Sequence, residues 1–137
     1  MSIVLDGTNG ITAPDFTDTG GDTYQKDNIV GAVSQSGGVP TGAIVETGSN
    51  VNGQYVKYAD GTMVCWLADY NPTDLGGYYD WSLPTAFVDT TYFYSPTNAN
   101  GSTIYTVAWP ASRKTTTSCR CRYFVARVNM YAIGRWF

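Results

Sequence analysis

The stretch LADYNPTDLGGYYDW, residues 67–81, gathers the side chains best suited to recognition or acid–base chemistry. Its aromatic residues have flat apolar faces, and its aspartates and asparagine accept hydrogen bonds. Sugar recognition uses this mixture, because a pyranose has an apolar C–H face and a rim of hydroxyls, and aromatic rings add rigid contact area at low entropic cost. The candidate ligand-binding residues are Asp69, Tyr70, Asn71, Asp74, Tyr78, Tyr79, Asp80 and Trp81. The alternative is a long loop whose tyrosines fold back and cap the core.

Glycoside hydrolysis is the second chemistry that these carboxylates suggest. It uses paired carboxylates roughly 5–9.5 Å apart, and Asp69, Asp74 and Asp80 are the nearest in sequence, with Glu46 the single glutamate. Aspartates in turn-rich loops more commonly bond to the backbone, and closeness in sequence does not set such a separation. The sequence has no histidine, which removes Ser–His–Asp and Cys–His catalysis. We therefore expect a protein that is not an enzyme.

The three cysteines are Cys65, Cys119 and Cys121. Cys119 and Cys121 lie two apart, on one face of a strand, a spacing poorly suited to a mutual disulfide. Either of them could pair with Cys65 across the sheet and leave one odd thiol, and the alternative is that all three are buried and reduced. We expect neither a metal ion nor a cofactor.

Charge is scarce and unevenly distributed. Charged residues make up 14% of the chain and aromatic residues 15%, which indicates a surface suited to contact and hydrogen bonding. Residues 1–95 hold all 11 acidic residues against two lysines, a net charge of −9, and residues 96–137 hold six basic residues and no acid, a net charge of +6. Either the basic part pairs in space with the acidic part of the same or a neighbouring chain, or it faces an anionic surface such as a phosphorylated glycan or a membrane. Nucleic acid is not an expected partner at a pI near 4.5.

The elements that would position these residues are β-strands. QYVKYADGTMVCW predicts a hairpin with a type I′ turn at Asp60-Gly61, and Asn100-Gly101 is a second turn signal. The nearly continuous apolar run from Met63 to Ala68 predicts a strand covered on both faces. CRCRYFVARVNMYAIGRW supplies one long bent strand or two consecutive strands. The predicted fold is all-β, a small antiparallel β-sandwich of about six to eight strands over residues 44–137.

Residues 1–43 have a different composition from the rest of the chain, with eight of the 15 glycines and only two of the 20 aromatic residues. The apolar groups between their turn-forming stretches are short, so this segment should be extended and ordered only when docked on something. The start has no secretory pattern, and the sequence holds no apolar run of about 18 residues, so we expect no membrane insertion.

Three stretches carry a resemblance to a known family. They are GSNVNGQYVKYADGTMVCW (48–66), WSLPTAF (81–87) and YAIGRWF (131–137). In this order and spacing they resemble the C-terminal domain of bacteriophage tail-fibre and related virion spike proteins, across roughly 44–137. The start MSIVLDGTNGIT also looks like the opening of many phage fibre-like proteins.

The resemblance implies an H-type-lectin-like β-sandwich, usually a homotrimer, that attaches a virion to a host-surface glycan. It implies assembly in the host cytoplasm, exposure on the particle surface, and docking on other virion proteins through residues 1–43, for which a trimerising stalk or a disordered leader are the alternatives. No ligand residue carries over from the family, because its loops vary. A structural virion protein, such as a head fibre, decoration protein or tail adaptor, is the alternative function. A secreted lectin is a third reading, which the missing secretory pattern disfavours.

The last residues of the sequence raise a separate question, because two large rings gain little by standing in water. In a trimer, the last strands would lie around an axis, and burying one such ring stabilises by about 1.5–3 kcal/mol. The predicted interface residues are Ile133, Arg135, Trp136 and Phe137. Arg135 would then need an acidic partner or an exit to solvent. The alternative is that the last strand packs within its own chain.

Overall fold

The computed structural model describes residues 5–6, 10–11, 16–17, 23–24, 29–71, 78–99, 113–122 and 127–137. Asp74 and the predicted turn at Asn100-Gly101 lie outside these residues. The strands are β1 (Leu5–Asp6), β2 (Gly10–Ile11), β3 (Phe16–Thr17), β4 (Thr23–Tyr24), β5 (Gln35–Ser36), β6 (Val39–Pro40), β7 (Val45–Asn50), β8 (Gly53–Tyr58), β9 (Thr62–Tyr70), β10 (Tyr78–Ser82), β11 (Phe93–Asn98), β12 (Ser118–Arg122) and β13 (Val128–Arg135).

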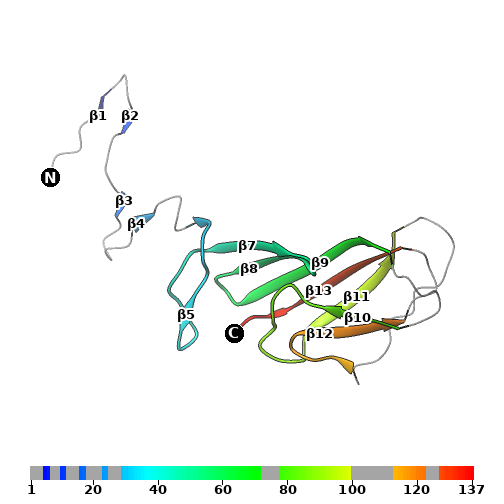
Figure 1. Ribbon diagram of the computed structural model, residues 1–137. Helices are drawn as coiled ribbons and strands as arrows, with labels where there is room; N and C mark the ends of the chain where they lie inside the picture. The colour runs from blue at the N-terminus through cyan, green and yellow to red at the C-terminus, as the bar shows by residue number, and fades with distance from the viewer. Residues whose placement is uncertain are drawn as a thin grey trace.

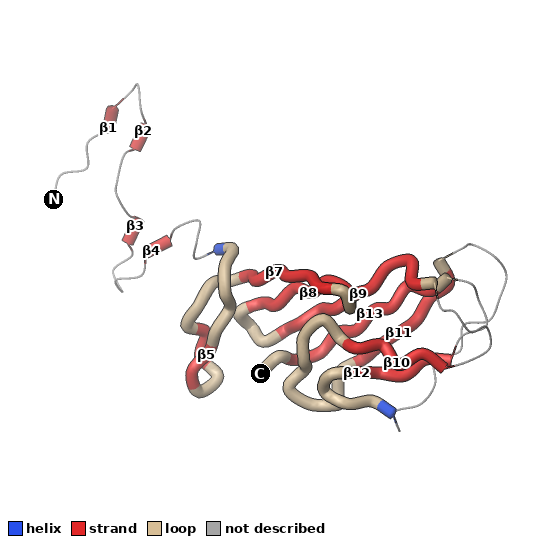
Figure 2. Tube along the Cα trace, in the orientation of Figure 1, coloured by secondary structure: helices blue, strands red, loops and turns tan. Residues whose placement is uncertain are grey.

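An antiparallel sheet in the order β11-β13-β9-β8-β7 forms the larger layer, and a two-stranded ribbon of β10 and β12 packs against one of its faces (Figure 1). Figure 2 shows that the loops lie mainly at the ends of these strands. The prediction of an all-β, antiparallel, sandwich-like fold is confirmed. In the part of the chain that the structure describes, no helix is long and apolar enough to cross a membrane.

The core lies between the sheet and the ribbon. Alternate residues of β9 and β13 point into it, as the two-residue period of a strand requires. The ribbon closes the core from the other side, and the indole Nε1 of Trp81 donates a hydrogen bond to the Asn52 carbonyl at 2.8 Å. The fully or almost fully buried side chains from these four strands are Met63, Cys65, Trp81, Cys119, Cys121, Val128, Met130 and Ala132.

Two tyrosines fasten the ribbon to the sheet. The Tyr94 hydroxyl donates to the Arg120 carbonyl at 2.8 Å, and the Tyr92 hydroxyl lies 2.8 Å from the Ser118 carbonyl. The Tyr92 ring stacks on Phe87, with ring centroids 4.3 Å apart. These bonds join tyrosines at the start of β11 to backbone carbonyls of β12, so the second layer keeps a fixed position over the core.

The predicted hairpin at Asp60-Gly61 is present, but its turn is not type I′. β8 and β9 pair in register up to Lys57 and Met63, and the backbone N–H of Gly61 donates to the Tyr58 carbonyl at 3.0 Å. Gly61 has φ +91°, whereas Asp60 does not have a positive φ. A type I′ turn needs a positive φ at both central residues. Asp60 instead accepts the backbone N–H of Thr62 at 2.8 Å.

The prediction that β9 is covered on both faces is wrong for the single chain. Met63 and Cys65 are fully buried on the inner face, but Val64 and Trp66 are only half-buried on the outer face, and Ala68 is exposed. The reason is that the ribbon covers one side of the sheet only. The segment CRCRYFVARVNMYAIGRW forms two strands, β12 in the ribbon and β13 in the sheet.

The end of the N-terminal segment packs on the sandwich. The backbone N–H of Ala43 donates to the Ala32 carbonyl, that of Gly31 to the Val45 carbonyl, and both Val33 and Ala43 are buried. The Glu46 carboxylate accepts hydrogen bonds from the backbone N–H of Val33 at 3.0 Å and from the Tyr55 hydroxyl at 2.9 Å.

Lys57 Nζ adds a third hydrogen bond to Glu46 at 3.2 Å. Burial alone would raise the pKa of Glu46, but the hydrogen bonds from Val33, Tyr55 and Lys57 outweigh it and lower the pKa. An ionised Glu46 therefore holds residues 31–43 against the sheet.

Candidate functional site

The aromatic stretch divides between the two faces of the ribbon. Tyr79 pairs with Cys121 and Trp81 with Cys119 on the face toward the core, whereas Tyr78 and Asp80 are on the face toward solvent. Trp81 is 0% exposed, so it is a core residue and has no face for a ligand. The prediction that Trp81 binds a ligand is therefore wrong.

The rings of Tyr70 and Tyr79 stack on each other. Their ring centroids are 4.1 Å apart with an interplanar angle of 20°, and both rings pack against the core. Burial raises the pKa of the Tyr79 phenol above its ordinary value. For these two residues, the structure has the arrangement expected of tyrosines that cap the core.

Asp69 marks a β-bulge. Val128 pairs with Tyr70 and Met130 with Leu67, so that Asp69 lies in the extra length of β9 opposite Asn129. Asp69 has φ +54°, and its backbone N–H donates to the Asn129 side-chain oxygen at 2.9 Å.

The two described aspartates of the candidate site are both paired with arginines. Arg127 binds the Asp69 carboxylate, and Arg120 donates through two nitrogens to the Asp80 carboxylate. The hydrogen bonds from Arg120 hold the pKa of Asp80 below its ordinary value, which is opposite to the raised pKa of a general acid. Both pairs join the acidic part of the sequence to the basic part, as the internal interpretation of the charge asymmetry predicts.

Tyr78 and Asn71 remain at the surface of this end of the molecule. Tyr78 is 53% exposed, and the guanidinium groups of Arg120 and Arg122 lie 5.5 and 5.7 Å from its ring centroid. Asn71 is exposed at the end of β9. The structure therefore brings Tyr78, Asp80 and two arginines together, while Tyr79 and Trp81 point to the other side.

Two of the four predicted interface residues are fixed within their own chain. The backbone N–H of Trp136 donates to the Gly61 carbonyl at 3.0 Å, and its indole Nε1 donates to the Tyr58 carbonyl at 2.8 Å. Phe137 makes an edge contact with Trp136, with ring centroids 4.5 Å apart. Trp136 also packs against the core cluster. This is the arrangement expected of a last strand that packs within the single chain, and a role at an interface stays a prediction.

Ile133 and Arg135 are on the outer face of the sheet, away from the ribbon. Strand register places the outward residues of neighbouring strands in rows across this face. One row is Phe93–Ile133–Val64–Val56–Thr47, and the next is Ser95–Tyr131–Trp66–Gln54–Ser49. Neither row contains a charged residue. Phe93 is 64% exposed and Tyr131 41% exposed, so large apolar side chains of this face stand in water in the single chain.

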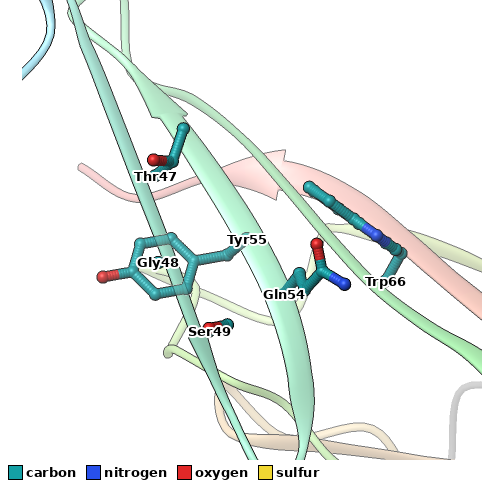
Figure 3. A pocket seen from close by; sticks show the side chains of 6 residues that line it. All are labelled: Thr47, Gly48, Ser49, Gln54, Tyr55 and Trp66. Atoms are coloured by element: carbon teal, nitrogen blue, oxygen red, sulfur yellow. The ribbon is translucent and has the colours of Figure 1, made fainter.

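A groove lies at the β7 side of the sheet (Figure 3). It has a volume of about 420 Å³. Its lining residues are Thr47, Gly48, Ser49, Gln54, Tyr55 and Trp66. Register places Thr47, Ser49, Gln54 and Trp66 on the outer face, with their side chains in adjacent positions of the two rows.

The three cysteines are free and fully buried. Burial raises the pKa of the Cys65 and Cys119 thiols to about 12 and that of Cys121 to about 11, so all three stay protonated at neutral pH. Among the residues with described positions, no group of three or more histidine, cysteine, aspartate or glutamate side chains is arranged to hold a metal ion.

A scan against protein-family models, a search of curated proteins and a search of solved structures each returned no match.

Proposed function

We propose that this chain is a non-enzymatic bacteriophage fibre or spike protein, which assembles as a homotrimer and attaches the virion to a host-surface glycan. The proposal combines the resemblance of residues 44–137 to tail-fibre domains with the surface of the five-stranded sheet. Residues 1–43 would dock the protein on other virion proteins. The protein would then be assembled in the host cytoplasm and exposed on the particle.

The observation that carries the proposal is the open outer face of β9, β13 and β11. The sequence of β9 is that of a strand buried on both sides, but Val64 is left half-buried, and Ile133 and the 64% exposed Phe93 lie beside it in one row. Burial of apolar area stabilises association by about 25 cal/mol per Å² before the cost of ordering. Because the row Phe93–Ile133–Val64 carries no charge, a second copy of the chain can cover it without burying an unpaired ion.

A structural virion protein is the second candidate, and one observation favours it. At the end of the molecule where receptor binding was predicted, Tyr70 and Tyr79 stack on each other and both described aspartates are paired with arginines. A surface with its groups already paired gains less from a new ligand. In this version the sandwich contacts only other virion proteins.

Sedimentation equilibrium of the purified full chain tests the self-association. We expect a trimer for the natural sequence and a folded monomer for Phe93→Asp, because the substitution places a carboxylate in the covered face. Val51→Asp is the matched control, since Val51 is 93% exposed at the turn between β7 and β8 and lies outside the two rows. A monomer for the natural sequence would contradict the trimer.

Adsorption to host cells separates the two functions. A receptor-binding protein should compete with intact phage for the host surface when added as the purified trimer. A trimer that does not compete, but restores particles that lack the protein, would instead support the structural role.

A further inference from the structure

We infer that the groove at the β7 side of the outer face binds a neutral saccharide, an inference that rests on the proposed attachment function and names its site. The groove is separate from the aromatic stretch at residues 67–81 that the sequence singles out. It is instead built by three consecutive strands, β7, β8 and β9.

The side chains that face the groove have the chemistry of a sugar site. Trp66 supplies an aromatic ring for an apolar C–H face. Gln54 offers two donors and an acceptor, and the hydroxyls of Ser49 and Thr47 each donate and accept. The volume of about 420 Å³ lies within the roughly 300–1,000 Å³ that is common for small-molecule sites.

The absence of charged residues from the lining indicates which class of sugar the groove can bind. No lining residue is a carboxylate, a lysine or an arginine, and the Tyr55 phenol is already engaged with Glu46 at 2.9 Å. An acidic or phosphorylated sugar would lose water around its charge without gaining a counter-charge here. A neutral hexose or N-acetylhexosamine has only hydroxyl and amide groups, which the groove can match.

The backbone beneath the groove is held in place before any ligand binds. The Tyr55 ring lies directly against Gly48, where an added Cβ would be 2.5 Å from the ring, and Gly53 lies against the Trp66 carbonyl, where an added Cβ would be 2.3 Å away. The Asn50 side chain donates to the Pro84 carbonyl at 2.8 Å and ties the β7–β8 turn to the following loop. A pre-ordered site loses less free energy on binding.

The groove and the proposed contact between copies use different halves of the face. Phe93 is on β11, at one edge of the sheet, whereas Ser49 and Thr47 are on β7, at the opposite edge. Strands lie about 4.8 Å apart, so the two edges of a five-stranded sheet are separated by roughly 19 Å. A second copy seated on Phe93, Ile133 and Val64 leaves the Trp66 ring and the β7 half of the face open to solvent.

The test is a titration of the full chain, observed by nuclear magnetic resonance, with methyl glycosides of glucose, galactose and N-acetylglucosamine and with N-acetylneuraminic acid. We expect at least one neutral glycoside to shift the Trp66 indole and Gln54 side-chain amide signals, and the acidic sugar to shift neither. The indoles of Trp81 and Trp136 are internal controls, because each donates its Nε1–H to a carbonyl of the same chain. The absence of any shift at Trp66 and Gln54 with all three neutral glycosides would overturn the inference.

Two variants link the site to attachment. Trp66→Leu and Gln54→Ala should each weaken glycoside binding on the order of tenfold or more, while Val39→Ala, at an exposed position of β6 outside the groove, should leave it unchanged. If both groove variants still adsorb to host cells like the natural protein, the groove is not the site but attachment stands. If the natural trimer itself does not adsorb, the proposed function fails, whereas a saccharide shift at Trp66 would still support the groove as a sugar site.

Discussion

The two faces of the five-stranded sheet are made of similar residues but have different environments. On the inner face, Met63, Cys65 and Ala132 are 0% exposed beneath the ribbon. On the outer face, Val64 is half-buried and Tyr131 is 41% exposed with nothing of the described chain above them. Apolar side chains alone therefore do not tell which face is the core. The ribbon accounts for the cover of the inner face, whereas no second layer of described residues lies over the outer face.

The inner face should be the more sensitive of the two, and Trp81 gives the largest effect. Trp81→Ala removes a fully buried ring together with its hydrogen bond to Asn52, so we expect a loss of about 3–5 kcal/mol in the free energy of unfolding. Urea unfolding of the isolated chain measures this loss. A cost below about 1 kcal/mol would mean that the ribbon is not a true second layer.

A substitution of Glu46 tests how firmly residues 31–43 are held against the sheet. Glu46→Ala leaves the Val33 N–H and the Tyr55 hydroxyl without their acceptor, so we expect a loss of about 1–3 kcal/mol. Limited proteolysis should then cut within residues 31–43 first. Equal protection of that segment in the natural and variant chains would show that Glu46 does not hold it.

The same carboxylate gives a pH dependence with a definite sign. The folded state lowers the pKa of Glu46 below its ordinary 4.5, so its contribution is present above that value and is lost as the pH falls through the lowered pKa. We expect the acid limb of the stability curve to flatten in Glu46→Gln, which cannot ionise. Thermal unfolding between neutral pH and pH 3 (roughly one unit below the usual glutamate range) checks this, and an unchanged acid limb would assign the effect to other carboxylates.

The smallest effect on the single chain is expected on the outer face. Phe93 is 64% exposed, so Phe93→Ala should change the free energy of unfolding of the isolated monomer by no more than about 0.5 kcal/mol. At high protein concentration the same variant should be clearly less stable than the natural chain, because the ring then contributes to the contact between copies. The same small cost at every concentration would mean that nothing covers this face.

The class of fold could be predicted well from the sequence. Which side chains of each strand face the core and which face solvent could be predicted only poorly. Alternation and turn residues located the β8–β9 hairpin, because Asp60-Gly61 interrupts two β-rich runs. The edge strand β7 was not foreseen, since VETGSN is polar and contains a glycine. Its strand conformation depends on pairing with β8 and on the Tyr55 ring against Gly48, which are contacts that no local pattern reveals.

The candidate site shows the same limit. In the sequence, residues 78–81 look like part of one ligand-binding surface. The pairing of β10 with β12 instead places Tyr79 and Trp81 on the face toward the core and Tyr78 and Asp80 on the face toward solvent. Ion pairing of Asp69 and Asp80 depends on arginines about 40 to 60 residues later in the chain. The groove was missed because its residues come from three strands, and only their register brings Ser49, Gln54 and Trp66 into one row.

The position of β13 in the sheet affects how the chain folds during synthesis. This strand follows the other four strands of its sheet along the sequence, yet it lies between β9 and β11. During synthesis, β7, β8 and β9 can form a local meander early, but the sheet cannot close until residues 128–135 have left the ribosome. Until then β9 presents an unpaired edge of the kind that joins neighbouring chains indiscriminately. We therefore expect a nascent chain halted before β13 to depend on chaperones, and the five-stranded sheet to close once β13 has been made.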